Sequence, residues 1–138
     1  MSRILIVDDD LKWQDILQHQ LSSRYEVGFA TNSYDAISKI EDAFRAGKLY
    51  DAYVLDTMFL DKPTGVLSYE APLKLARQIL QRGAQPTRIF MIGYVNQLFM
   101  QEASELGIIK FYYKEKKSKV EGQQSYVQIR ADLDAILK

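Results

Sequence analysis

Short apolar segments alternate with longer amphipathic segments along the whole chain, and this alternation limits the fold more than any other feature. The first apolar segment, Ile4–Val7, is largely β-branched and apolar at every position, which is typical of a strand buried on both faces of a sheet. The segment that follows has apolar residues at helical spacing: Trp13, Ile16, Leu17 and Leu21. We therefore expect a strand followed by a helix, repeated to the end of the chain.

The repeated pattern predicts five strand–helix pairs in one domain that covers residues 1–138. The predicted strands are Ile4–Val7, Tyr25–Ala30, Ala52–Asp56, Ile89–Ile92 and Lys110–Tyr113. The predicted helices lie around Trp13–Leu21, Ser33–Ala46, Leu73–Leu80, Leu98–Leu106 and Ile129–Leu137, and we expect loops at 57–71 and 114–124. Such an alternation favours an α/β fold, in which right-handed crossovers place helices on both faces of a parallel sheet.

Composition excludes several function classes. The chain has 18 basic and 18 acidic side chains and a formal net charge of zero, so it has no general attraction for nucleic acid or an anionic membrane. It contains no cysteine, which excludes disulfide and thiolate chemistry and fits a cytoplasmic protein. No apolar stretch approaches the ~20 residues of a membrane helix.

Acidic residues follow two of the predicted strands at the points where they end. Asp8 and Asp9 come directly after the first strand, and Asp56 ends the third. In a flavodoxin-like sheet of order 2-1-3-4-5 these two strands are neighbours, so the three carboxylates would share one crevice at the carboxyl edge. Carboxylates so close repel one another unless a cation intervenes, and Mg²⁺ prefers such oxygen ligands. With Lys114 nearby, a carboxylate there could attack a phosphoryl donor.

Three segments together resemble the receiver domain of response regulators in two-component signal transduction, in particular the chemotaxis-type receivers. Residues 4–10 resemble the receiver opening with its acidic pair, residues 50–56 resemble the segment that ends in the phosphoacceptor, and residues 107–114 resemble the last strand with its lysine. The likeness covers essentially the whole chain. It implies a three-layer sandwich with five helices.

The resemblance also implies roles for individual residues. Asp56 would accept a phosphoryl group from a sensor histidine kinase or a phosphotransfer protein, and Lys114 would contact a phosphoryl oxygen. Asp9 and Asp56 would bind Mg²⁺ directly, Asp8 would act through water, and the Met58 carbonyl would complete the protein ligands.

Signal output is expected to follow the same family pattern. Phosphorylation would shift a two-state equilibrium on the face of the fourth helix, fifth strand and fifth helix, with Phe111 as the switch aromatic. A downstream output protein or domain would read that face, and a homodimer could form through it. The resemblance implies a signalling domain rather than a conventional enzyme, with no direct contact to nucleic acid or membrane.

The chain departs from the family pattern at several positions. Gly93 stands where receivers usually have threonine or serine, so no hydroxyl is available there to bind the phosphoryl group. Glu115 stands where proline is usual, and the segment after Asp56 is longer than usual. Tyr94 is a weaker candidate for the missing hydroxyl, because a phenol reaches farther and points differently.

These departures leave alternatives open. A pseudo-receiver would use the same fold for protein interaction without phosphorylation. Asp8–Asp10 could simply cap the first helix, and Lys114 could belong to a solvated charge run. A phosphatase of the haloacid dehalogenase type is disfavoured because Lys12 replaces the Thr or Val of its motif. A flavodoxin is disfavoured because three aspartates would repel a flavin phosphate.

Overall fold

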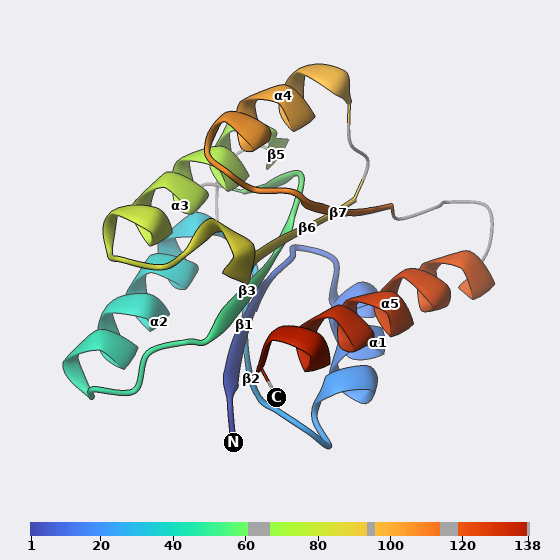
Figure 1. Ribbon diagram of the computed structural model, residues 1–138, viewed down its shortest axis with the longest axis horizontal. Helices are drawn as coiled ribbons and strands as arrows, with labels where there is room; N and C mark the ends of the chain where they lie inside the picture. The colour runs from blue at the N-terminus through green and yellow to red at the C-terminus, as the bar shows by residue number, and fades with distance from the viewer. Residues whose placement is uncertain (61–66, 94–95, 114–118, 138) are drawn as a thin grey trace.

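A five-stranded parallel sheet forms the centre of the molecule (Figure 1). The computed structural model describes residues 1–60, 67–93, 96–113 and 119–137. The sheet has the order β2-β1-β3-β6-β7, and every adjacent pair of strands is parallel. Its strands are β1 (Arg3–Val7), β2 (Glu26–Ala30), β3 (Ala52–Asp56), β6 (Ile89–Gly93) and β7 (Lys110–Tyr113). The predicted strand order 2-1-3-4-5 is therefore confirmed.

Five α-helices cover the two faces of the sheet, as predicted. They are α1 (Leu11–Leu21), α2 (Ser33–Arg45), α3 (Glu70–Gln81), α4 (Gln97–Glu105) and α5 (Lys119–Leu137). Helices α1 and α5 lie on one face, and α2, α3 and α4 lie on the other (Figure 1). Among the described helices, none has both the length and the apolar character that crossing a bilayer requires.

The sheet separates two apolar cores, because successive side chains of a strand point to opposite faces. In β1, Leu5 and Val7 belong to the core under α2, α3 and α4, whereas Ile4 and Ile6 belong to the core under α1 and α5. Both sets are almost completely buried. This burial on both faces explains why the strands are apolar at consecutive positions.

Both predicted loops were partly wrong. Within 57–71, β4 (Phe59–Leu60) pairs antiparallel with β5 (Leu67–Ser68), and α3 begins at Glu70. Phe59 is fully buried in the core, which ties this short hairpin to the domain. Within 114–124, α5 begins at Lys119, in a polar stretch containing Gly122 that carries no apolar helical period. A short 3₁₀ helix, η1 (Pro86–Arg88), precedes β6.

Candidate metal and phosphoryl site

Three carboxylates meet at the carboxyl ends of β1 and β3. Asp8, Asp9 and Asp56 each offer an oxygen, and these atoms all lie within 4.8 Å of one another. The two strands bring them together because Val7 pairs with Leu55 in the parallel register, so both strands end at the same edge. Asp8 is 3 % exposed and Asp56 8 % exposed, whereas Asp9 is half-buried. The cluster could hold a hard divalent cation, which would offset the repulsion among these carboxylates.

The backbone around Asp8 is held by hydrogen bonds to its neighbours. The Asp10 N–H donates to the Asp8 carboxylate at 2.9 Å. The buried Gln14 side-chain amide donates to the Asp8 carbonyl at 2.7 Å and to the Ala30 carbonyl at 3.2 Å. Gln14 therefore links α1 to the ends of β1 and β2. These bonds limit the movement of the chain that carries the first two carboxylates.

Helix capping explains one of the three consecutive aspartates. The Asp10 side chain is the N-cap of α1 and accepts a hydrogen bond from the Lys12 N–H at 3.0 Å. Asp8 and Asp9 instead lie in the carboxylate cluster. The capping alternative is therefore correct for Asp10, while the predicted grouping of the other two with Asp56 is observed.

The backbone at Gly93 passes unusually close to Asp56. Gly93 has φ +146°, a conformation that L side chains rarely adopt. A Cβ atom at this position would lie 2.4 Å from the Thr57 Oγ1 and 2.7 Å from the Asp56 Oδ1. Glycine is favoured here because any side chain would be strained at this φ and would displace Thr57 or Asp56. Sequence reasoning identified the missing hydroxyl at Gly93 but overlooked the threonine next to Asp56.

A second hydroxyl that the sequence did not reveal belongs to Tyr126 on α5. Its side chain is fully buried, its ring centre lies 5.2 Å from that of Trp13, and its hydroxyl has no hydrogen-bond partner among the described residues. Burial is the largest cause that raises the pKa of Tyr126, followed by the charges of Asp8, Asp56 and Asp10. The phenol therefore stays protonated at neutral pH. Tyr126 lies between the predicted loop at 114–124 and the predicted helix that begins at Ile129, so no helical period indicated it.

Of the other residues predicted to act at the site, the structure describes Met58 and Phe111 but not Lys114 or Tyr94. Met58 is half-buried and lies two residues after Asp56. Phe111 is half-buried on β7, pairs in register with Met91, and packs against the core under α2, α3 and α4. Lys114 and Tyr94 lie outside the described residues.

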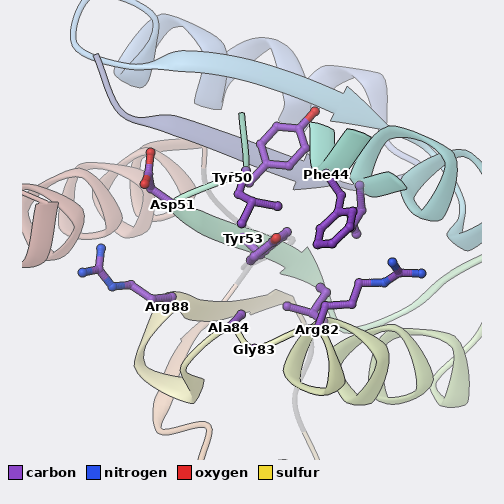
Figure 2. A pocket seen from close by; sticks show the side chains of 11 residues that line it. Phe44, Tyr50, Asp51, Tyr53, Arg82, Gly83, Ala84 and Arg88 are labelled. Carbon is purple, nitrogen blue, oxygen red and sulfur yellow. The ribbon is translucent and has the colours of Figure 1, made fainter. Parts of the chain in front are cut away.

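A cavity of about 280 Å³ lies at the opposite end of β3, between α2, α3 and η1 (Figure 2). Its lining is largely aromatic and aliphatic and includes Phe44, Tyr53 and two arginines. Figure 2 shows that the guanidinium groups of Arg82 and Arg88 point away from each other, so they do not converge on one ligand group. Arg82 is also paired with Glu41 at 2.9 Å. The cavity is thus distinct from the carboxylate cluster in both place and chemistry.

Comparison with solved structures places the fold. A CheY-like response regulator receiver domain protein from Methanospirillum hungatei JF-1 is 22 % identical with a TM-score of 0.70, over 98 % of this chain and 95 % of that chain. The chain has the receiver-domain fold. A two-component response regulator from Clostridium difficile is also 22 % identical, with a TM-score of 0.68 and complete coverage of both chains. The Mn²⁺-bound form of response regulator Rcp1 is 12 % identical with a TM-score of 0.77, over 95 % of this chain and 93 % of that chain.

No protein-family model matches the chain, and no curated protein matches it either. At these identities the structural likeness establishes the fold alone.

Proposed function

We propose that this receiver-fold domain accepts a phosphoryl group on Asp56 and acts in two-component signal transduction. The observation that carries the proposal is the cluster of Asp8, Asp9 and Asp56, whose carboxylate oxygens lie within 4.8 Å of one another at the edge where α/β sheets place their functional groups. This arrangement supplies both a nucleophile and ligands for a cation. The formal net charge of zero gives no reason to propose binding to nucleic acid or to an anionic membrane instead.

The donor set fits Mg²⁺, which is commonly bound through one or two carboxylates and keeps several waters. In the proposal, Asp9 and Asp56 bind the ion directly, Asp8 binds through water, and the Met58 carbonyl completes the set. When bound, the ion neutralises charge on the phosphoryl oxygens. The predicted role of Lys114 is to contact another of these oxygens.

The proposed transfer step requires little covalent work from the protein. A carboxylate oxygen of Asp56 attacks the phosphorus, and a new O–P bond forms as the bond between phosphorus and the donor breaks. The electron pair of that bond leaves with the donor group, which then takes a proton from solvent. The product is an acyl phosphate on Asp56, and attack by water returns the carboxylate and inorganic phosphate. The chain contributes chiefly by holding the carboxylates in position.

The proposal includes partners and a signalling face. The donor is a sensor histidine kinase or a phosphotransfer protein in the cytoplasm, and residues 1–138 act as one receiver domain. Output passes through the face formed by α4, β7 and α5, where Phe111 is the proposed switch aromatic and where a homodimer could form. Slow loss of the phosphoryl group is the only catalysis proposed.

One observation favours a second candidate, a pseudo-receiver that binds a partner without phosphorylation. Gly93 offers no hydroxyl where receivers usually have one, and its backbone conformation disfavours any side chain. The carboxylate cluster is nevertheless complete, and a pure interaction module has no need for buried acidic groups that repel one another.

A phosphodonor experiment separates the two candidates. The purified protein is incubated with acetyl phosphate and Mg²⁺, and its intact mass is measured. We expect the mass of one phosphoryl group to be added to the wild type and to be lost in Asp56→Asn. Asp51→Asn is the matched control, because Asp51 lies just before the other end of β3 and its carboxylate accepts from the Arg3 N–H at 2.8 Å. No mass gain with acetyl phosphate or phosphoramidate would contradict the proposal and favour the pseudo-receiver.

A further inference from the structure

The space next to the proposed phosphoacceptor is occupied by a hydroxyl from an unexpected position. A Cβ atom on Gly93 would lie 2.4 Å from the Thr57 Oγ1, well inside van der Waals contact. A threonine or serine at 93 would carry its own hydroxyl one bond beyond that Cβ. The Thr57 hydroxyl therefore lies directly beside the space that a side chain at residue 93 would enter.

The same point in space locates Thr57 relative to Asp56. The Asp56 Oδ1 lies 2.7 Å from the Cβ position of Gly93, so this oxygen and the Thr57 Oγ1 flank one small volume. Thr57 is 1 % exposed, and its N–H donates to the Ile92 carbonyl on β6 at 3.0 Å. The threonine is thus buried beside β6, next to the proposed phosphoacceptor.

We propose that the Thr57 hydroxyl replaces the hydroxyl missing at Gly93 and contacts the phosphoryl group on Asp56. This inference rests on the proposed function and adds a binding residue to the same site. The hydroxyl donates a hydrogen bond to a phosphoryl oxygen, where a charged acceptor makes the bond stronger than one between neutral groups. It stabilises the transferring group and the acyl phosphate, without changing the ligands of the cation.

The position of Thr57 also differs from that of residue 93 in the fold. A hydroxyl at residue 93 would be carried by β6, the strand next to β3. Thr57 instead follows Asp56 directly, at the end of β3. The proposed contact is therefore made by the segment that carries the phosphoacceptor itself.

Three proteins test the proposal: the wild type, Thr57→Val and Thr57→Ser. Valine keeps the shape of threonine without the hydroxyl, and serine keeps the hydroxyl. The rate of phosphorylation by acetyl phosphate in saturating Mg²⁺ and the lifetime of the acyl phosphate are followed by intact mass. We expect the rate to fall about tenfold or more in the valine variant and to return to within about twofold in the serine variant.

The Mg²⁺ affinity shows whether a substitution at Thr57 has damaged the carboxylate cluster, because such damage would change it. Calorimetric titration with Mg²⁺ should give the same affinity for all three proteins, because the proposed contact is to the phosphoryl group alone. If the valine variant fails to fold, as judged by circular dichroism, Thr57→Ala takes its place. Serine restoring the rate that alanine loses supports the proposal, and equal rates for serine and alanine overturn it.

The outcomes distinguish this inference from the proposed function. If wild type and Thr57→Val accept the phosphoryl group at equal rates and hold it equally long, Thr57 has no such role while Asp56 remains a phosphoacceptor. If the wild type accepts no phosphoryl group, the proposed function itself fails and the role of Thr57 falls with it. A loss of Mg²⁺ affinity in Thr57→Val would also overturn the inference, because it would place the threonine in the metal site.

Discussion

The two ends of β3 differ in packing and in charge. At the carboxyl end, two nearly buried aspartates and a third carboxylate share one site, and the backbone of Gly93 lies against Asp56 and Thr57. At the amino end, Tyr53 lines a cavity of about 280 Å³ among aromatic and aliphatic side chains (Figure 2). Polar groups are therefore packed closely at one end of β3, whereas the other end borders a cavity with a largely apolar lining. The comparison indicates where the chain tolerates change and where it does not.

The largest expected difference is in the stability lost when a glycine at each end of β3 is replaced by alanine. Gly93 and Gly83 both have positive φ, +146° and +100°, but a Cβ on Gly83 would meet no atom within 4 Å. Gly93→Ala should lower the free energy of unfolding by about 2–5 kcal/mol, since backbone strain of about 1–2 kcal/mol adds to overpacking of about 1–3 kcal/mol. Gly83→Ala should cost only the strain, about 1–2 kcal/mol. Urea denaturation measures both.

A double variant checks the cause of this difference. Adding Thr57→Ala to Gly93→Ala removes the closer of the two contacts and should recover part of the lost stability. Equal losses for Gly83→Ala and Gly93→Ala would show that the crowding at Asp56 has no energetic consequence.

Removing a carboxylate at the carboxyl end of β3 should weaken Mg²⁺ binding, whereas removing one near the amino end should not. Asp9→Asn leaves two of the three clustered carboxylates, and we expect the Mg²⁺ affinity to fall about tenfold or more, which corresponds to about 1.4 kcal/mol. Asp51→Asn removes an aspartate near the amino end of β3 and should leave the affinity unchanged. Isothermal titration calorimetry gives both values. Similar affinities in the Asp9 variant and the wild type would remove Asp9 from the ligand set.

Alkaline pH should reveal the burial of Tyr53 at the amino end. Burial is the main cause that raises the pKa of Tyr53 to about 12, from an ordinary value of 10.0. Between pH 10 and pH 12 the folded state keeps the phenol proton, whereas the unfolded state loses it. The contribution of Tyr53 to the free energy of unfolding is therefore complete below pH 10 and is lost as the pH rises toward 12. By pH 11 the wild type should lose about 1 kcal/mol relative to Tyr53→Phe.

Urea midpoints between pH 9 and pH 11 measure this effect. Tyr34→Phe is the control, because Tyr34 is 71 % exposed and its hydroxyl meets water in both states. A parallel pH dependence of wild type and Tyr53→Phe would mean that Tyr53 titrates as an ordinary phenol.

The smallest effect is expected for an ion pair at the amino end. Arg82 and Glu41 lie 2.9 Å apart, with side chains 36 % and 41 % exposed. Arg82→Ala should therefore lower the free energy of unfolding by only about 0.2–1 kcal/mol, and less in high salt. Phosphorylation of Asp56 should be unchanged. A loss of phosphorylation in this variant would show that the two ends of β3 are coupled.

The sheet could be predicted from the sequence because each central strand is buried on both faces and therefore has a run of consecutive apolar residues. The hairpin of Phe59–Leu60 and Leu67–Ser68 could not, since strands of two residues show no period. The start of α5 at Lys119 was missed because the first residues of this helix carry no apolar stripe.

The candidate site shows a similar division. Asp8, Asp9 and Asp56 could be predicted because strand order alone brings the ends of β1 and β3 together. The proximity of Thr57 to Gly93 depends on how closely two neighbouring backbones approach, and no residue pattern records that distance. The buried hydroxyl of Tyr126 likewise depends on where α5 packs. The roles of Lys114, Met58 and Phe111 remain predictions.

The contact between Thr57 and Gly93 also constrains the order in which this protein can change over generations. A mutation that introduces threonine at position 93 meets the Thr57 side chain and should be eliminated by selection while Thr57 is present. Replacement of Thr57 must therefore come first. If Thr57 carries the working hydroxyl, that intermediate lacks a hydroxyl at both positions. Each of the two arrangements is then reached from the other only through a less active intermediate, and we expect relatives to carry a hydroxyl at one of the two positions but rarely at both.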